Sequence, residues 1–152
     1  MISICIPIYN FHVVDLIITI INQGEESKKP YEVICIDDGS NKETLKLNAE
    51  INSHNAVKYL ILKKNIGRSK IRNLFLENAN YENLLFIDCD CSIQSENFLA
   101  NYFEQLDNAV VYGGRKHHDN PPKNKNKKLR WLYGMKREDQ KLNYRVKSPD
   151  QR

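Results

Sequence analysis

Strand-like and helix-like segments alternate along most of this chain, and that order restricts the fold more than any other feature. Apolar runs rich in isoleucine and valine alternate with stretches whose apolar side chains recur at helical spacing. The expected strands are 2–8, 31–36, 57–62, 83–87 and 109–112, and the expected helices are 11–22, 41–53, 67–79 and 95–106. Such alternation is typical of βαβ units with right-handed crossovers. We therefore expect an α/β fold: a mostly parallel open sheet with helices on both faces.

The periodicity stops after the fifth expected strand. Residues 115–128 contain paired histidines, Pro121-Pro122 and a run of lysine and asparagine, which predicts a loop. A helix is expected to follow from Leu129 to about Leu142. We accordingly divide the chain into a domain of residues 1–114 and a segment of residues 115–152.

Charge differs between these two parts. Residues 1–114 carry 10 basic and 15 acidic side chains, whereas residues 115–152 carry 13 basic and 4 acidic ones. A basic segment beside an acidic domain favours an anionic partner such as a membrane surface. The segment has no recognised nucleic-acid motif, so we expect no nucleic-acid partner.

Composition indicates a cytoplasmic location. The chain has no apolar stretch long enough to span a bilayer, and the first expected strand begins directly after Met1, so we expect no signal or transit peptide. Four cysteines, at positions 5, 35, 89 and 91, lie in or beside expected strands. We interpret them as buried or half-buried reduced thiols, because their spacing does not supply the four ligands of a structural zinc site.

Two aspartates follow the fourth expected strand, in Asp88-Cys89-Asp90. Along an extended chain, positions i and i+2 face the same side, and two carboxylates held together repel each other unless a cation or proton intervenes. Mg²⁺ and Mn²⁺ take oxygen ligands from carboxylates and substrate phosphates together. A strand-end turn with solvated acids is the alternative for so short a motif.

Polar residues also follow the first two strands: Tyr9-Asn10 after the first and Asp37-Asp38 after the second. In open α/β sheets, ligands bind beyond the carboxyl ends of the strands, where the strand order reverses. Together with the acids after the fourth strand, these residues predict one acidic crevice.

Two arginines add the opposite charge near this crevice. Arg68 and Arg72 lie four residues apart at the start of an expected helix, and both guanidinium groups and helix N-termini favour phosphate. Pairing of each arginine with surface acids is the alternative. The chain has neither a glycine-rich dinucleotide fingerprint nor a Walker sequence, so side chains and a metal would have to hold a nucleoside diphosphate.

Residues 2–114 resemble the family 2 glycosyltransferases of the Rossmann-like GT-A fold. The resemblance rests on residues 2–10, 33–40, 65–68 with 72–73, and 88–90. It implies an inverting enzyme that transfers a sugar from a nucleoside-diphosphate sugar, UDP-linked, to an acceptor hydroxyl in the synthesis of cell-surface polysaccharide or glycoconjugate.

The resemblance assigns the nucleoside side of the site to the first two strand ends. Pro7, Tyr9 and Asp38 would line the base pocket, with a carboxylate accepting from a uracil-like imide N–H. Asn10 is included among the substrate-binding residues, and Asp37 would support that loop or the ribose.

The diphosphate side falls on the later motifs. Arg68 or Arg72 would approach the base or the diphosphate. Asp88 would lie near the ribose, and Asp90, in the DXD motif, would bind Mn²⁺ or Mg²⁺ together with the phosphates.

The resemblance also implies an acceptor half, of which residues 129–138 resemble the beginning. The chain is then the donor-binding half of a larger enzyme, a truncated GT-A fold: residues 1–114 bind the donor, and residues 115–152 form a basic loop and the start of the acceptor half. The general base is expected beyond Arg152, and Glu138 and Asp139 are interpreted as a solvent-facing helix surface. The acceptor is a saccharide or a lipid-linked saccharide, with peripheral membrane contact through residues 115–147.

Two other classes of protein were weighed. A phospho-acceptor signalling domain would need an acidic pair after the first strand, where this chain has Tyr9-Asn10. A non-catalytic nucleotide- or anion-binding module with a basic tail remains the alternative to an enzyme.

Overall fold

The computed structural model describes residues 1–108, 111, 113, 116–117 and 120–139. They belong to two compact units, Met1–Ala109 and Val110–Arg152, and each is described by itself. Most of the expected fifth strand, at positions 109, 110 and 112, lies outside the described residues. No helix in the described part of the chain has the length and hydropathy needed to cross a bilayer.

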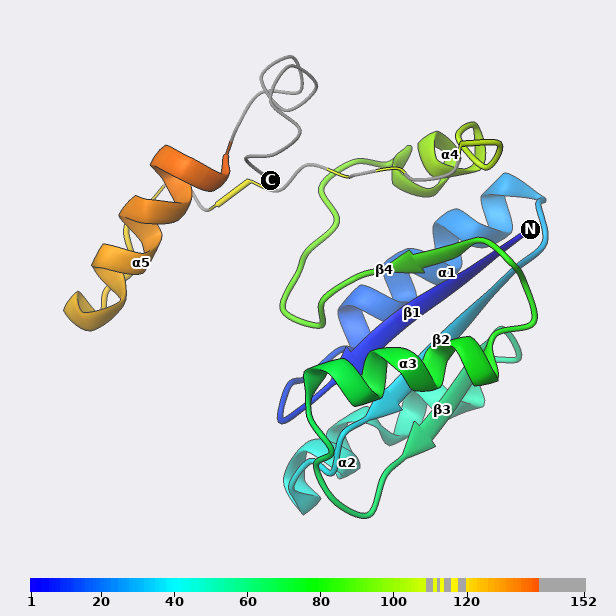
Figure 1. The fold of residues 1–152 in the computed structure, drawn as a ribbon, viewed down its shortest axis with the longest axis horizontal. Coiled ribbons are helices and arrows are strands. Elements are labelled where there is room, and N and C mark those ends of the chain that lie inside the picture. Colours follow the sequence, from blue (N-terminus) through cyan, green and yellow to red (C-terminus); the bar gives the residue numbers. More distant parts are fainter. Residues whose placement is uncertain (109–110, 112, 114–115, 118–119, 140–152) are drawn as a thin grey trace. The chain divides into compact units, whose positions relative to one another are not determined.

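A four-stranded parallel sheet forms the centre of the first unit (Figure 1). Its strands are β1 (Ile2–Ile8), β2 (Tyr31–Asp37), β3 (Val57–Ile61) and β4 (Leu84–Phe86). The strand order is β3-β2-β1-β4, and all three neighbouring pairs are parallel. The predicted α/β fold is therefore confirmed. Because β1 has β2 on one side and β4 on the other, the order reverses between β1 and β4.

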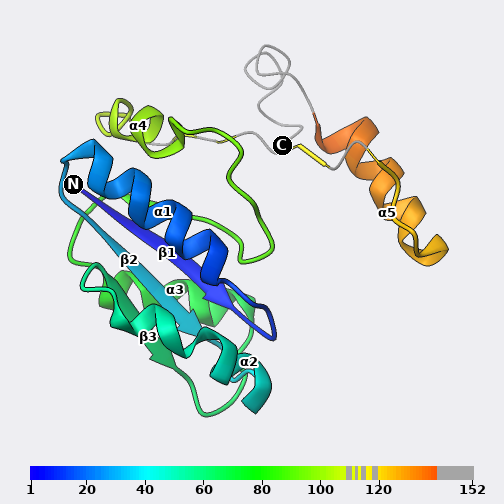
Figure 2. The same ribbon diagram turned by 180° about the vertical axis from the view of Figure 1, so that it is seen from behind.

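Alternate residues of the central strands supply two hydrophobic cores. Ile4 and Ile6 of β1 belong to the core that includes helix α1 (Val14–Ser27), whereas Ile34 and Ile36 of β2 pack with helix α3 (Arg68–Asn78). Figures 1 and 2 show α1 and α3 on opposite faces of the sheet. Helices on both faces explain why the strands are nearly continuous apolar runs.

Helix α1 begins three residues later and ends five residues later than the expected helix of residues 11–22. The late start has a physical reason in Asn48, which is fully buried. Its side-chain oxygen accepts from the Val13 N–H at 3.0 Å, and its amide nitrogen donates to the Phe11 carbonyl at 2.9 Å. These bonds hold residues 11–13 in a loop.

The helix after β2 follows the prediction at its start. Helix α2 spans Lys42–Asn48, and of the two candidate N-caps that precede it, Ser40 and Asn41, it is Asn41 that accepts from the Thr44 N–H at 2.9 Å. The rest of the expected helix is a 3-10 turn, Ala49–Ser53.

Helix α4 (Phe98–Phe103) is shorter than the expected helix of residues 95–106. Gln23 of α1, not Ser95, supplies its cap: the Gln23 side chain accepts from the Leu99 N–H at 3.0 Å and donates to the Ser95 carbonyl at 2.8 Å. A cap from a distant helix leaves Ser95 in the preceding turn.

In the second unit, one helical run extends from Lys125 to Glu138. It consists of η2 (Lys125–Lys127), α5 (Lys128–Tyr133) and the π-helical η3 (Gly134–Glu138). The expected helix is thus present as far as Glu138, and its last residues, 140–142, lie outside the described part. The run begins before Leu129, inside the expected loop, because the Asn124 side chain caps it by accepting from the Asn126 N–H at 2.9 Å.

The four cysteines are free thiols. Cys5 and Cys35 are buried and Cys89 is half-buried, as expected, but Cys91 is exposed, so the expectation is wrong for that residue. Burial and the charge of Glu32 raise the pKa of the Cys5 thiol to about 12, which keeps it protonated.

Candidate functional site

Asp37, the last residue of β2, is fully buried and belongs to a polar network beneath the sheet edge. Its carboxylate accepts from the Ser40 N–H at 2.7 Å and from the Tyr59 hydroxyl of β3 at 3.3 Å. Burial, followed by the Asp37 charge and hydrogen bond, raises the pKa of Tyr59, so its hydroxyl remains a donor. The supporting role predicted for Asp37 fits these contacts.

Asp38 holds the loop that leads into α3. One carboxylate oxygen accepts from the Ile66 N–H at 2.7 Å and the other from the Gly67 N–H at 3.1 Å, and only 5% of the residue is exposed. Gly39 allows the close approach of the two loops, because a Cβ there would lie 2.7 Å from the Lys64 main chain. The carboxylate keeps further lone pairs for a ligand, so its predicted contact with a base is not blocked by these bonds.

The loop after β1 is tied to the same turn through Asn10. The Asn10 N–H donates to Ser40 Oγ at 2.8 Å, and its side-chain oxygen accepts from the Asn41 N–H at 2.9 Å. Asn10 has a positive φ of 49°, which asparagine tolerates better than most residues. Asn10 therefore has a structural task within the protein. Its neighbour Tyr9 is exposed, and Pro7 is half-buried.

At the end of β4 the two aspartates differ in their surroundings. Asp88 accepts from Arg72 of α3, with 3.0 Å between Nη2 and Oδ1, and the Arg72 guanidinium lies 5.8 Å from the Phe86 ring centroid. Asp90 is exposed, and within the described ranges no residue donates a hydrogen bond to its carboxylate or forms an ion pair with it. One carboxylate is therefore neutralised internally and the other is available to a ligand.

The prediction that Asp88 and Asp90 face the same side of an extended chain is wrong. The strand ends at Phe86, and the Cys91 N–H donates to the Asp88 carbonyl at 3.0 Å, so residues 88–91 form a turn. Side-chain alternation applies to extended chain and does not apply here. For Arg72, the structure has the alternative of a pair with an acid, Asp88, whereas the predicted approach of Arg68 or Arg72 to a ligand stays a prediction.

The chain that leaves β4 stays beside β1. The Ile87 N–H donates to the Cys5 carbonyl at 3.1 Å, and Cys89 is half-buried two residues later, with burial raising the pKa of its thiol. These residues lie where the strand order reverses between β1 and β4, which is where open α/β sheets bind ligands.

Arg68 and Arg72 begin the first two turns of α3. Both are exposed and, being four residues apart, they share one side of the helix. Gly67 precedes them with a φ of 91°, a conformation that side chains rarely adopt. The helix N-terminus adds partial positive charge on this side of the crevice.

The donor set fits a metal that is shared with a substrate. Within the described ranges, no three His, Cys, Asp or Glu side chains are grouped closely enough to hold an ion by themselves. Mg²⁺ and Mn²⁺ commonly bind through one or two carboxylates plus substrate phosphates and water. The Asp90 carboxylate, which has no partner among the described residues, meets that requirement.

Comparison with known proteins identifies the family of the chain. The model of the family described as "Glycosyl transferase family 2" matches residues 3–151. The chain belongs to this family.

Two curated relatives of this chain are chondroitin synthases. The protein of Pasteurella multocida (strain Pm70) is 31% identical over 124 residues, which cover 77% of this chain and 12% of the relative. The protein of Escherichia coli is 32% identical over 122 residues, which cover 77% of this chain and 18% of the relative. The chain thus spans less than a fifth of the length of either relative.

Solved structures resemble the chain in fold. A mannosyltransferase from Pyrobaculum calidifontis in complex with GDP-Man and Mn²⁺ has a TM-score of 0.58 and 22% identity, covering 72% of this chain and 33% of that protein. TarS from S. aureus in complex with UDP-GlcNAc has a TM-score of 0.54 and 28% identity, covering 70% and 31% respectively. These neighbours confirm the Rossmann-like GT-A architecture of the glycosyltransferase.

Three positioning residues of the candidate site were not predicted from the sequence. Asn48 holds the loop after β1, Tyr59 holds Asp37, and Ser40 accepts from Asn10. A buried asparagine at the end of a short helix was the available signal for the first, because buried polar groups need partners. The sequence around Tyr59 and Ser40 contains no pattern that indicates their contacts with Asp37 and Asn10.

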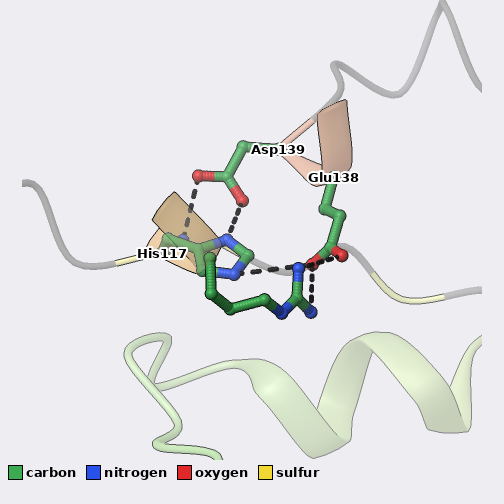
Figure 3. A network of polar contacts seen from close by, with 4 residues as sticks. His117, Glu138 and Asp139 are labelled. Atoms are coloured by element: carbon green, nitrogen blue, oxygen red, sulfur yellow. Dashed lines mark hydrogen bonds and ion pairs between the residues drawn. The ribbon is translucent and has the colours of Figure 1, made fainter. Parts of the chain in front are cut away.

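The second unit contains a further polar network that was also missed (Figure 3). His117 Nδ1 lies 2.7 Å from Asp139 Oδ1, the His117 N–H donates to Asp139 Oδ2 at 2.9 Å, and His117 Nε2 lies 3.5 Å from Glu138 Oε2. Arg130 also pairs with Glu138. The interpretation of Glu138 and Asp139 as a solvent-facing helix surface is therefore wrong, because both carboxylates are half-buried against the His117 ring.

Proposed function

We propose that this chain is the donor-binding part of an inverting glycosyltransferase that transfers a sugar from a UDP-sugar to an acceptor hydroxyl. The observation that carries the proposal is the asymmetry at the end of β4: Asp88 is paired with Arg72, whereas Asp90 is exposed beside it. The Asp90 carboxylate and the diphosphate of the donor are both negatively charged. A divalent cation between them would therefore be needed to hold the diphosphate at this position.

Asp90 would hold Mn²⁺ or Mg²⁺ together with the diphosphate. When bound, the metal neutralises charge that develops on the leaving diphosphate. The protein's own residues bind and orient the donor. Arg68, exposed at the start of α3, is placed to attract the phosphates, and Tyr9 offers an exposed ring beside the first strand end.

The choice of UDP and of pathway is supported by the relatives. Two of the relatives in sequence are chondroitin synthases, and the neighbour TarS was solved with UDP-GlcNAc. On that basis we propose a role in the synthesis of cell-surface polysaccharide or glycoconjugate, on the cytoplasmic side of the membrane. The general base would lie in the acceptor half.

Calorimetry tests the donor site directly. The chain is titrated with UDP, GDP and their sugars, with and without Mn²⁺, and we expect binding of a uridine nucleotide that depends on the metal. Asp90→Asn should abolish the metal dependence. The matched control is Asp107→Asn, which removes another exposed carboxylate of the same unit.

Two results would contradict the proposal. Absence of metal-dependent nucleotide binding by the folded protein would exclude a donor site of this kind. Equal loss of binding in both variants would show that overall charge, and not the position of Asp90, governs affinity.

A further inference from the structure

The helical run of residues 125–138 has two different faces. One face packs within the second unit: Gly134 lies so close to His117 that a Cβ on it would overlap the imidazole ring, and Arg130 and Glu138 pair on the same side. Residues 130, 134 and 138 are spaced by four, so they lie on one side of the helix. These contacts identify the side of the helical run that packs against the rest of the second unit.

A different face carries apolar side chains that point to solvent. Leu129 is 79% exposed, Leu132 is 37% exposed and Tyr133 is 57% exposed. Positions i, i+3 and i+4 form one stripe along a helix, so these three side chains make a continuous patch. We refer to Leu129, Leu132 and Tyr133 as the outer face.

Basic side chains flank the outer face at its N-terminal end. Residues 123–128 carry four lysines and no acidic side chain, and Lys123, Lys125, Lys127 and Lys128 are all exposed. The acidic side chains that follow, Glu138 and Asp139, pair with His117, and Glu138 also pairs with Arg130. The charge presented to solvent beside the apolar stripe is therefore positive.

We propose that the outer face binds an anionic membrane surface. An apolar stripe rimmed by lysines is the pattern of helices that lie in the bilayer interface, where leucine and tyrosine enter the boundary of the acyl chains and lysines pair with anionic head groups. Burial of the stripe also removes exposed apolar area that otherwise favours aggregation. This inference goes beyond the donor site, because it concerns other residues and stands whether or not the chain binds UDP.

Vesicle binding by the whole 152-residue chain tests the proposal. Sedimentation compares vesicles of phosphatidylcholine with vesicles of equal parts phosphatidylcholine and phosphatidylglycerol. We expect binding to the anionic vesicles only, weakened by salt, which shortens the Debye length from about 10 Å at 0.1 M to about 3 Å at 1 M.

Variants separate the two parts of the surface. Replacing both Leu129 and Leu132 with serine should lower the partition coefficient at least about tenfold, because each leucine loses a large part of its transfer free energy. Leu76→Ser is the matched control, since Leu76 is 65% exposed in α3 of the first unit, and it should bind vesicles as the wild type does. Circular dichroism checks that all variants retain their helices.

Three outcomes would overturn the proposal: no sedimentation with anionic vesicles, equal binding to both kinds of vesicle, or unchanged binding after the double serine substitution. Binding of the wild type to double-stranded DNA in place of vesicles would assign the basic surface to nucleic acid instead. None of these outcomes bears on uridine nucleotide binding, so a failure here is distinguishable from a failure of the donor site.

Discussion

Asp38→Asn changes one atom type at a buried position and tests how the loop before α3 is held. The Asp38 carboxylate accepts from two main-chain N–H groups, those of Ile66 at 2.7 Å and Gly67 at 3.1 Å. Asparagine keeps only one oxygen, so one N–H would face the NH₂ group and lose its acceptor. An unsatisfied buried donor costs about 1–3 kcal/mol, and the remaining bond loses the extra strength of a charged acceptor, about 1 kcal/mol.

The expected destabilisation is therefore about 3 kcal/mol. For a unit of this size, such a change lowers the melting temperature by at least about 10 °C. Thermal melting followed by circular dichroism measures it, and hydrogen exchange of β1 and β2 assigns the transition to the first unit. The amides of Ile66 and Gly67 should also exchange faster in the variant.

The exposed Asp107→Asn variant is the control and should melt as the wild type does. If Asp38→Asn stays within about 0.5 kcal/mol of the wild type and its loop amides remain protected, the carboxylate does not hold this loop. The two hydrogen bonds of Asp38 would then not be what positions residues 66 and 67 before α3.

Three further substitutions or conditions have defined outcomes. Arg72→Gln breaks the pair with Asp88, but both side chains are 44% exposed, so the pair contributes less than about 1 kcal/mol and urea unfolding should change little; a drop several times larger would refute this. Gly67→Ala places a side chain at a φ of 91° in open space, and we expect backbone strain alone to cost about 1–2 kcal/mol, measured in the same titration. Burial alone would raise the pKa of Asp139, but the hydrogen bonds and the charge interaction with His117 outweigh burial and lower this pKa. The contact therefore contributes its full stabilisation of the folded state above the ordinary aspartate pKa. That stabilisation is lost as the pH falls through the lowered pKa of Asp139. The NMR shift of the His117 amide across an acid titration should follow that loss, and an amide signal that does not move would contradict it.

The fold was predictable where structure depends on local periodicity. Strand β1 has the predicted bounds, and Ile71 and Phe75 of α3 point inward as their spacing indicates. Apolar alternation and helical spacing report directly which face is buried, so they need no knowledge of partners far along the chain.

Two of the misses share one physical cause, which is a contact with a residue that the local sequence pattern does not reveal. The start of α1 depends on Asn48, and the position of Asp88 depends on Arg72 of the preceding helix. For the candidate site, the strand ends supplied the predicted residues Tyr9, Asp38 and Asp90, whereas the hydrogen bonds that hold Asp38 come from tertiary structure. A motif names the side chains in a site, but their pairing decides which of them remain available.

The cap of α4 by Gln23 has a consequence for how the first unit folds. The N–H group of Leu99 donates to Gln23, which lies in α1, 76 residues earlier in the chain. This hydrogen bond can therefore form only after α1 and the segment of α4 have come together. A six-residue helix is too short to persist alone in water, and α4 buries Leu99 and Phe103 in the core that α1 shares. We therefore expect α4 to be among the last elements to form and the first to open. Hydrogen exchange at Leu99 would follow the docking of α1 and not the local helix propensity of residues 98–103.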